Sequence, residues 1–368
     1  MLPDTQPVWL GSLQLRLPSL HSQRGVIMHD LSRRSFFTVA GGAAAALALA
    51  ACGREGSEGS DSGGDAAAGG PWEFTDDLGK KISLPARPQR IVAYVSGAAA
   101  LWDFGVRPVG VYGPTKGDDG KPNLQAGNMD VNAVQSVGGE DYSQISVEKL
   151  TALNPDLLIA SLAGPTSADR WVIKDDIAQI EKVCPVYSIQ ESGKPLPEVI
   201  TAYETLAKNL GADVAATPIT QARDQFTAAG DDLKAAIAEK QGLRVEFAYA
   251  DTDGFYVASP QFYPNLAWYT QLGMNTVRKG DPKTDFLEQL SWEQAGKYPA
   301  DLICMDIRTF SLQPAQLVKE QPTFAALPAV KAGQLGGYNG EPRFSYRQAV
   351  DEVTKLAASV RKSRTGVA

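Results

Sequence analysis

The chain has 368 residues and a formal net charge of −7, with 35 Lys and Arg against 42 Asp and Glu. An acidic chain of this kind argues against nucleic acid as a partner, because the phosphate backbone attracts basic surfaces. Its two His residues, His21 and His29, both lie near the N-terminus. Once that segment is removed, the chain cannot build a Ser-His-Asp hydrolase, a His general base or a metal site of imidazoles.

Residues 1–51 are predicted to be an export signal. Residues 32–38, Ser-Arg-Arg-Ser-Phe-Phe-Thr, are typical of a twin-arginine signal, and the apolar stretch after them is shorter than the roughly 20 residues that span a bilayer. Met28 is an alternative start, since the residues before it carry no signal character. The stretch ends in Leu-Ala-Ala-Cys at residues 49–52, which looks like a lipobox. We expect cleavage before Cys52 and lipidation of its thiol, which would anchor the exported protein to the outer face of a bacterial cell membrane.

The rest of the chain divides by composition. Residues 52–71 are mostly Gly, Ser, Ala, Asp and Glu, so they predict a flexible lipoprotein linker that cannot bury a core. We expect an N-terminal α/β lobe over residues 72–214, a connecting helix over 215–241 and a C-terminal α/β lobe over 242–368.

Strands and helices alternate in the N-terminal lobe. The pattern predicts strands at 91–94, 106–112, 156–160 and 185–188, and helices at 98–104, from 147, at 171–182 and at 197–210. Such alternation is typical of parallel sheets that are covered on both faces.

Apolar residues at three- and four-residue spacing, including Ile219, Phe226 and Leu233, predict a long helix between the lobes. A short helix-to-helix link within one domain is the alternative, and Gly230 leaves room for it. The second lobe repeats the rhythm, with strands expected at 244–251, 255–258 and 302–306 and helices at 265–272 and 345–362. The lone thiols Cys184 and Cys304 are expected to be buried separately.

One phrase occurs in both lobes. Residues 146–159 and 291–303 each begin Ser-x-Glu, reach Asp ten residues after the Ser, and continue into an apolar run. Each copy predicts a short helix capped by Ser, a turn and a buried strand. A first-turn Glu stabilises a helix by about 0.3–1 kcal/mol through the helix dipole, which is one interpretation of Glu148 and Glu293. Their matched positions favour a shared exposed role.

Several phrases occur in a characteristic order. They are residues 77–80 (Asp-Leu-Gly-Lys), 88–92 (Pro-Gln-Arg-Ile-Val), 104–111 (Phe-Gly-Val-Arg-Pro-Val-Gly-Val), the two Ser-x-Glu phrases, and 327–335 (Leu-Pro-Ala-Val-Lys-Ala-Gly-Gln-Leu). Over residues 72–362 the chain resembles the substrate-binding lipoproteins of bacterial ABC importers, in the branch that carries ferric siderophores, haem and cobalamin. The resemblance implies two Rossmann-like α/β lobes joined by a single long backbone helix, the class III periplasmic-binding-protein fold.

The resemblance also implies a function. The protein would capture a ferric siderophore in the cleft between its lobes, with little hinge motion, and deliver it to a membrane permease that works with an ATPase. It would act as a monomer, catalyse nothing and need no cofactor or metal ligand, because the siderophore supplies the iron's six oxygens. By the same resemblance, Glu148 and Glu293 dock into arginine pockets of the permease.

Ligands of open α/β sheets bind beyond the carboxyl ends of the strands. That rule predicts a ligand-binding set of Tyr94, Ser96, Tyr112, Ser161, Arg308 and Tyr338, with Trp171 and Phe286 as further candidates for the cleft wall. Aromatic rings and one guanidinium suit a bulky, partly apolar iron chelate. The alternative for each Tyr is a half-buried core residue.

The chelate type and the ligand class have alternatives. Hydroxamate-binding relatives often place an Arg shortly before the first phrase, whereas residues 139–142 are Gly-Glu-Asp-Tyr. With no evident multi-arginine cluster, a neutral or weakly charged hydroxamate chelate is favoured over a triply negative catecholate. Cobalamin and haem remain alternatives, as does a surface sensor of the same fold. An exported hydrolase is disfavoured because no Gly-x-Ser-x-Gly elbow occurs.

Overall fold

The computed structural model describes residues 70–117, 120–139, 145–163, 170, 172–173, 176–280 and 286–368. The described residues belong to one compact unit that begins at Ala67. The expected export signal, most of the linker with Cys52, and Trp171 lie outside the described residues. Within the described part of the chain, no helix has both the length and the hydropathy that a membrane crossing requires.

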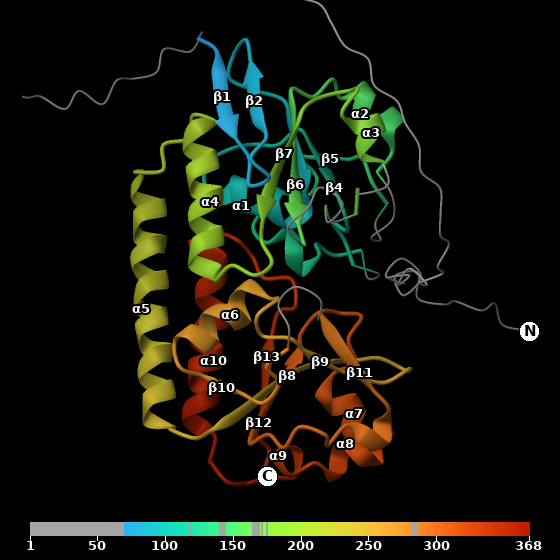
Figure 1. The fold of residues 1–368 in the computed structure, drawn as a ribbon, viewed down its shortest axis with the longest axis vertical. Coiled ribbons are helices and arrows are strands. Elements are labelled where there is room, and N and C mark those ends of the chain that lie inside the picture. Colours follow the sequence, from blue (N-terminus) through green and yellow to red (C-terminus); the bar gives the residue numbers. More distant parts are fainter. Residues whose placement is uncertain are drawn as a thin grey trace, which may run out of the picture. The chain divides into compact units, whose positions relative to one another are not determined.

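The N-terminal lobe is built on a five-stranded parallel sheet in the order β5-β4-β3-β6-β7 (Figure 1). Its strands are β3 (Ile91–Tyr94), β4 (Gly110–Tyr112), β5 (Gln135–Ser136), β6 (Leu157–Leu162) and β7 (Val186–Gln190). An antiparallel hairpin of β1 (Trp72–Thr75) and β2 (Lys81–Leu84) precedes them. The helical segments are α1 (Val95–Asp103), η1 (Leu124–Ala126), α2 (Val147–Ala152), α3 (Ile177–Ile180) and α4 (Leu196–Asn209). All four side chains of β3 are buried, as expected for a central strand covered on both faces.

Two predicted elements of this lobe are shorter than expected. The strand expected over 106–112 begins only at Gly110, and Pro108, which has no N–H to donate to a ladder, lies in the part that is not strand. Of the helix expected over 171–182, the described residues contain α3 alone, which spans Ile177–Ile180.

The C-terminal lobe holds a mixed sheet, which corrects the expectation of a parallel one. The order is β11-β9-β8-β12-β13, and β10 also pairs with β8. Its strands are β8 (Arg244–Ala250), β9 (Phe255–Ala258), β10 (Asn275–Thr276), β11 (Leu287–Leu290), β12 (Leu302–Asp306) and β13 (Leu335–Tyr338). The link from β8 to β9 is too short for a parallel crossover, so the two strands form an antiparallel hairpin. Asp251 fixes that turn by accepting hydrogen bonds from the N–H groups of Asp253 (2.8 Å) and Gly254 (3.1 Å).

Helices cover this sheet and join the lobes. They are α6 (Pro264–Gln271), η3 (Trp292–Gln294), α7 (Pro314–Glu320), α8 (Pro322–Ala326), α9 (Pro328–Lys331) and α10 (Tyr346–Lys362). The connecting helix α5 (Thr217–Glu239) is continuous for 23 residues and lies beside α10 (Figure 1). Two α/β lobes joined by one long helix confirm the predicted fold class.

Gly230 does not interrupt α5. A Cβ added there would lie 2.8 Å from Cζ2 of Trp268, so the glycine makes room for the indole ring. That ring stacks on Phe226 of the same helix at 5.0 Å between centroids. The cost of a helical glycine, about 1 kcal/mol, is offset by this close packing.

The start of α10 is fixed to the N-terminal lobe by hydrogen bonds. Ser345 caps α10 by accepting from the N–H of Gln348 (3.3 Å), and its hydroxyl donates to Asp103 of α1 (2.6 Å). The Gln348 side chain donates to the same carboxylate at 2.7 Å. On α4, Glu204 accepts from the hydroxyl of Tyr346 at 2.8 Å. We call this set, together with Phe226 and Trp268, the back interface.

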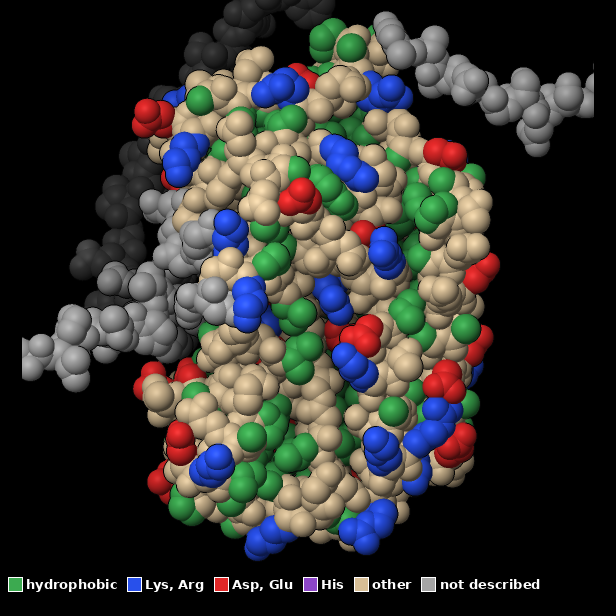
Figure 2. All heavy atoms as spheres, turned by 180° about the vertical axis from the view of Figure 1, so that it is seen from behind, with side chains coloured by type: hydrophobic (Ala, Val, Ile, Leu, Met, Phe, Trp, Pro, Cys, Tyr) green, Lys and Arg blue, Asp and Glu red, His purple; other side chains and the backbone are tan. Residues whose placement is uncertain are grey.

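Acidic and basic side chains are interspersed on the face opposite to that of Figure 1 (Figure 2). Among the described residues of that face, no single sign of charge forms a continuous field. This pattern differs from the basic stripe that a nucleic-acid-binding surface presents.

Candidate ligand-binding site

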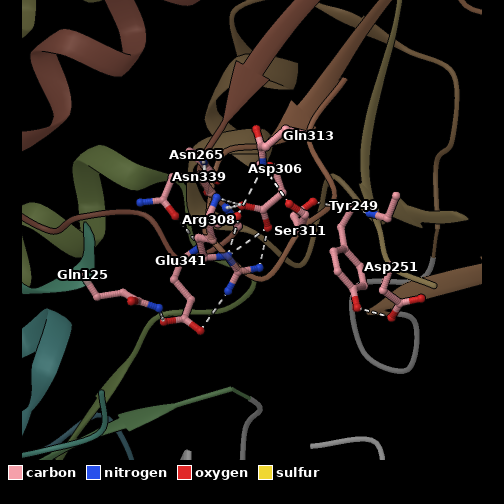
Figure 3. Close-up of polar contacts among 12 residues, drawn as sticks. Gln125, Tyr249, Asp251, Asn265, Asp306, Arg308, Ser311, Gln313, Asn339 and Glu341 are labelled. Atoms are coloured by element: carbon pink, nitrogen blue, oxygen red, sulfur yellow. Dashed lines mark hydrogen bonds and ion pairs between the residues drawn. The ribbon is translucent and has the colours of Figure 1, made fainter. Parts of the chain in front are cut away.

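The polar site lies beyond the carboxyl ends of β12 and β13. These strands are parallel neighbours, with Asp306 paired to Tyr338, so the loops that follow them leave the sheet at the same edge. The first loop carries Arg308 and the second carries Glu341. The two side chains therefore meet, as Figure 3 shows.

Arg308 is held between two carboxylates. Its Nε donates to both oxygens of Asp306 (3.1 and 2.9 Å), and Nη2 donates to Oδ2 of Asp306 at 2.5 Å. The remaining nitrogen, Nη1, donates to Oε1 of Glu341 at 2.9 Å. The guanidinium also lies 4.6 Å from the centroid of the Phe310 ring. Asp306 is fully buried and Arg308 is 9% exposed, so the ion pair fixes the guanidinium in one orientation.

The backbone around Arg308 is fixed by Gln313 and Gly340. The amide of Gln313 donates to the carbonyls of Asp306 (3.2 Å), Arg308 (3.3 Å) and Ser311 (2.8 Å). A Cβ added to Gly340 would overlap the Arg308 guanidinium and the Asp306 carboxylate, so only glycine fits. The loop and the ion pair therefore constrain one another.

The loop that presents Glu341 is positioned from the core of the same lobe. Asn265 of α6 donates to the carbonyl of Asn339 (3.0 Å) and to the buried carboxyl of Glu352 (2.8 Å). The Asn339 side chain in turn accepts from the N–H of Glu341 at 3.0 Å. Burial raises the pKa of Glu352, although the hydrogen bonds from Asn265 and Tyr269 lower it.

Glu341 also reaches the N-terminal lobe. Its Oε2 accepts a hydrogen bond from the hydroxyl of Tyr94 at 3.4 Å. It also accepts one from the amide of Gln125 in η1, as Figure 3 shows. A single carboxylate thus accepts from donors of both lobes. We call Tyr94, Gln125, Arg308 and Glu341 the Glu341 bridge.

A second carboxyl group lies at the edge of the N-terminal sheet. Glu191 directly follows β7 and accepts hydrogen bonds from the hydroxyls of Ser161 (2.7 Å) and Tyr203 (2.6 Å). Burial raises the pKa of Glu191 to about 7, although the bonds from Tyr203 and Ser161 lower it; the charge of Glu341 raises it further. The charge of Glu191 therefore changes near neutral pH.

Three of the predicted ligand-binding residues join these polar contacts. Tyr94 and Arg308 both bind Glu341, and Ser161 binds Glu191. Phe286 is half-buried and stacks on Tyr263 at 5.5 Å between centroids.

Three further described residues of the predicted set also have little or no exposed surface. Ser96 is 3% exposed in the first turn of α1. Tyr112 is fully buried, and its hydroxyl donates to the carbonyl of Ile159 at 3.4 Å. Tyr338 is 1% exposed and packs edge-on against Phe247 at 5.3 Å. Tyr112 and Tyr338 thus occupy core positions in this structure.

Sequence reasoning missed Glu341, Gln125 and Glu191. Glu191 is the first residue after a strand, so the strand-end rule could have found it. Glu341 lies three residues beyond β13, and Gln125 lies in a short 3-10 turn, where nothing in the pattern marks a site. The buried guanidinium groups of Arg170 and Arg278 were missed as well; they donate to the Ser188 hydroxyl (3.0 Å) and the Val257 carbonyl (2.9 Å).

The two Ser-x-Glu phrases expose their glutamates in different local structures. In α2, Ser146 accepts from the N–H of Lys149 at 3.3 Å, and Glu148 is exposed. The second copy forms only the 3-10 turn η3 rather than the expected α-helix, and Gly296 follows where the first copy has Thr151. Glu293 is also exposed, and a hydrogen bond with the Ser291 side chain lowers its pKa.

Among the described residues, no group of three or more His, Cys, Asp or Glu is arranged to hold a metal ion. Cys184 and Cys304 are separate buried thiols. Burial raises the pKa of Cys184 to about 12 and raises that of Cys304 as well, so both stay protonated at neutral pH.

Two hollows lie away from the Glu341 bridge. A small one of about 40 Å³ lies where Asp103, Ile219 and Tyr346 meet. A larger one of about 210 Å³ is lined by Glu246, Tyr298 and Leu327 of the C-terminal lobe. Burial raises the pKa of Glu246, whose Oε1 has no hydrogen-bond partner among the described residues.

Known proteins resemble this chain over most of its length. The family model for periplasmic binding proteins matches residues 92–340. The structure of DesE, a ferric-siderophore receptor protein from Streptomyces coelicolor, is 35% identical, with a TM-score of 0.75 over 80% of this chain and 99% of that one. The Fe(3+)-citrate-binding protein YfmC of Bacillus subtilis is 24% identical over 257 residues, 69% of this chain and 74% of the relative.

A further relative matches a shorter stretch. The putative ABC transporter substrate-binding lipoprotein YhfQ of Bacillus subtilis is 34% identical over 142 residues, 37% of this chain and 39% of the relative. The family match covers more than half of the chain, and the likeness to DesE covers nearly all of that protein. The chain therefore belongs to the periplasmic binding protein family.

Proposed function

We propose that this binding protein captures a ferric siderophore between its two lobes and delivers it to the permease of an ABC importer. The observation that carries the proposal is the 35% identity to DesE, a ferric-siderophore receptor, over 99% of that chain. The geometry is compatible with it, because a rigid guanidinium and half-buried rings lie where the strands end. An iron chelate brings its own metal ligands, so such a site needs shape and hydrogen bonds rather than coordinating side chains.

The contacts we propose follow from the donors at this edge. Arg308 would donate from Nη1 to a chelating oxygen, and we expect Glu341 to give up that nitrogen when the chelate binds. Tyr94 and Ser161 would offer hydroxyls, and Phe286 and Phe310 would offer apolar surface. Ser96, and Trp171 outside the described residues, stay on the proposed list. Tyr112 and Tyr338 would support these residues from the core.

A hydroxamate chelate fits this set best. Three hydroxamate groups cancel the charge of Fe³⁺, and a neutral complex does not need a cluster of free cations. Arg308 is already paired with two carboxylates. A triply negative catecholate complex would be attracted much less.

Delivery would use the exposed glutamates. Glu148 and Glu293, at matched positions in the two lobes, would dock into arginine pockets of the permease, whose ATPase drives import. The protein would act as a monomer and would be held at the outer face of the cell membrane by lipid on Cys52, after export through the twin-arginine route. The signal and lipobox pattern supports this placement, as does the lipoprotein description of YhfQ.

Ligand titration tests the proposal. The chain without residues 1–52 is titrated with a ferric trihydroxamate, ferric citrate, a ferric catecholate, cobalamin and haem, and tryptophan quenching is followed. We expect saturable quenching in the nanomolar range for the trihydroxamate. A response to cobalamin or haem alone, with silence for every iron complex, would overturn the proposal.

A further inference from the structure

The larger hollow of the C-terminal lobe, of about 210 Å³, lies beside the amino ends of β8 and β12 (Figure 1). The Glu341 bridge lies beyond the opposite, carboxyl ends of β12 and β13. We propose that this hollow is a second ligand-binding site, which takes a small organic cation with a primary ammonium group and a body of about one ring. Gly296, Pro299 and Pro328 are exposed where they line it, so a ligand can enter from solvent. Binding there does not require that the protein carries a siderophore.

The side chain of Glu246 points toward the apolar core on this side of the sheet. Side chains of a strand alternate between its two faces, so Glu246 shares a face of β8 with Ala248 and Ala250. Both alanines belong to a cluster of buried apolar residues that also contains Ile303, the residue paired with Glu246 on β12. A carboxyl group therefore lies among apolar neighbours.

Glu246 is buried without a partner among the described residues. It is 1% exposed, and its Oε1 accepts no hydrogen bond from them. Burial raises the pKa of Glu246. Buried carboxyl groups are normally hydrogen-bonded or paired with a cation, because burial without a partner costs free energy. The hollow, which Glu246 lines, is where a partner can lie.

The cations that lie nearest along the chain and at the wall are engaged elsewhere. Arg244, two residues earlier on β8, donates to Asp301 from Nε at 3.2 Å and from Nη2 at 3.1 Å. Lys297 forms an ion pair with Glu288, and its side chain is 47% exposed. No contact among the described residues joins either cation to Glu246. The carboxyl group is therefore open to a cation that comes from outside.

The walls of the hollow determine the size and character of the ligand. An apolar cavity of about 150 Å³ holds benzene, so about 210 Å³ has room for one ring and a short polar arm. Leu327 and Ala329 provide apolar walls. Tyr298 adds its ring, while its hydroxyl donates to Glu288 at 2.5 Å. Of the side chains that line the hollow, Glu246 carries the one carboxyl group.

A single carboxyl group discriminates between classes of ligand. A calcium ion takes about six to eight oxygen ligands, and the described residues place no three His, Cys, Asp or Glu side chains together for a metal. An anion would be repelled by the carboxylate, and a wholly apolar ligand would leave it without a partner. A primary ammonium group supplies both hydrogen-bond donors and the opposite charge.

Three ligands with the same ring isolate the charge. Dissociation constants of benzylamine, benzyl alcohol and benzoate are measured by calorimetry at neutral pH, with the wild-type protein and with Glu246→Gln. The substitution keeps the shape of the side chain and removes its charge. We expect the wild type to bind benzylamine below about 1 mM, about tenfold or more tighter than benzyl alcohol, and to show no binding of benzoate. Glu246→Gln should bind the amine and the alcohol about equally.

Two further variants localise the site. Leu327→Phe adds volume at the wall of the hollow and should weaken benzylamine binding by about tenfold or more. The control is Glu320→Gln, which removes an exposed carboxylate of α7 and should leave all three constants unchanged. Thermal melts show that each variant is folded. Benzylamine should also raise the melting temperature of the wild type and not that of Glu246→Gln.

The outcomes that would overturn the proposal are distinct. Equal constants for amine and alcohol in the wild type would remove the selection of a cation. A preference for the amine that survives in folded Glu246→Gln, or unweakened binding in folded Leu327→Phe, would place the ligand elsewhere. Neither heat of binding nor a thermal shift with benzylamine would show that the hollow takes no such ligand.

Discussion

Among the contacts that the described residues make between the lobes, the back interface and the Glu341 bridge are opposite in character. In the back interface, Phe226 packs on Trp268 at 5.0 Å and on Tyr346 at 5.7 Å, and Asp103 accepts two short hydrogen bonds across the lobes. In the Glu341 bridge, one carboxylate accepts hydrogen bonds from donors of both lobes. Apolar burial stabilises an interface only while the two surfaces stay in contact, whereas hydrogen bonds can be exchanged for hydrogen bonds to a ligand. The back interface should therefore keep the lobes fixed while the Glu341 bridge opens.

The largest effect is expected at Arg308. Arg308→Gln leaves the fully buried Asp306 without its cation, which should destabilise the protein by about 3–5 kcal/mol. Chelate affinity should fall by about 100-fold or more, because the charged donor is lost. Urea unfolding and fluorescence titration measure the two effects. The control is Arg308→Lys, which keeps the positive charge but lacks the planar guanidinium. Chelate affinity that stays at the wild-type level in Arg308→Gln would contradict the proposed contact.

A substitution in the back interface should lower the stability of the protein and leave its chelate affinity nearly unchanged. Asp103→Ala removes the acceptor of the Ser345 hydroxyl and the Gln348 amide, and we expect a loss of about 3 kcal/mol. Chelate affinity, measured under conditions where the protein is folded, should stay within about twofold. A large change in affinity with little change in unfolding would show that the roles of the two contacts have been reversed.

The next effect is a pH dependence from Glu191, which faces Ser161 of β6, Tyr203 of α4 and the charge of Glu341. Burial raises the folded pKa of Glu191 from 4.5 to about 7, so the native state holds a proton that the unfolded state has lost between these values. Stability contributed by that proton falls as pH rises toward 7. Glu191→Gln should remove this slope and gain about 2 kcal/mol relative to the wild type between pH 5 and pH 8. Parallel slopes of the two proteins in urea unfolding would show that Glu191 titrates normally.

The smallest effect on binding and stability is expected at the docking glutamates. Glu148 and Glu293 are exposed, so replacing both with Ala should change stability by less than about 1 kcal/mol and leave chelate affinity unchanged. Uptake of the iron chelate by cells should nevertheless fall, because the permease would lose its contacts. The exposed Glu320, changed to Ala in parallel, is the control. Wild-type uptake in the double variant would remove the docking assignment.

The architecture followed from periodicity and from the repeated phrase, because buried parallel strands and amphipathic helices leave clear patterns. The direction of the strands within a sheet could not be predicted in this way. The hairpin of β8 and β9 depends on a short turn at 251–254, which reverses the chain where a crossover was expected. Helix α5 runs through Gly230 because Trp268, far away in sequence, packs there. Tertiary contacts of this kind override local propensity.

The site was harder to predict than the fold. The strand-end rule named Tyr94, Ser161 and Arg308, which lie in polar contacts at that edge; their role in ligand binding stays a prediction. The strand-end rule could not distinguish these residues from Tyr112 and Tyr338, because a strand that is buried on both faces shows no alternation of apolar and polar residues. Nothing in the sequence showed that the acid at the bridge follows β13 or that its partners come from the other lobe.

The most direct test of the account is a crystal structure of the protein with a ferric trihydroxamate. We predict that a chelating oxygen accepts a hydrogen bond from Arg308, that Glu341 has left Nη1 of Arg308, and that Ser345 and Gln348 still bind Asp103. A complex in which the chelate lies elsewhere while Arg308 and Glu341 remain paired would contradict the account.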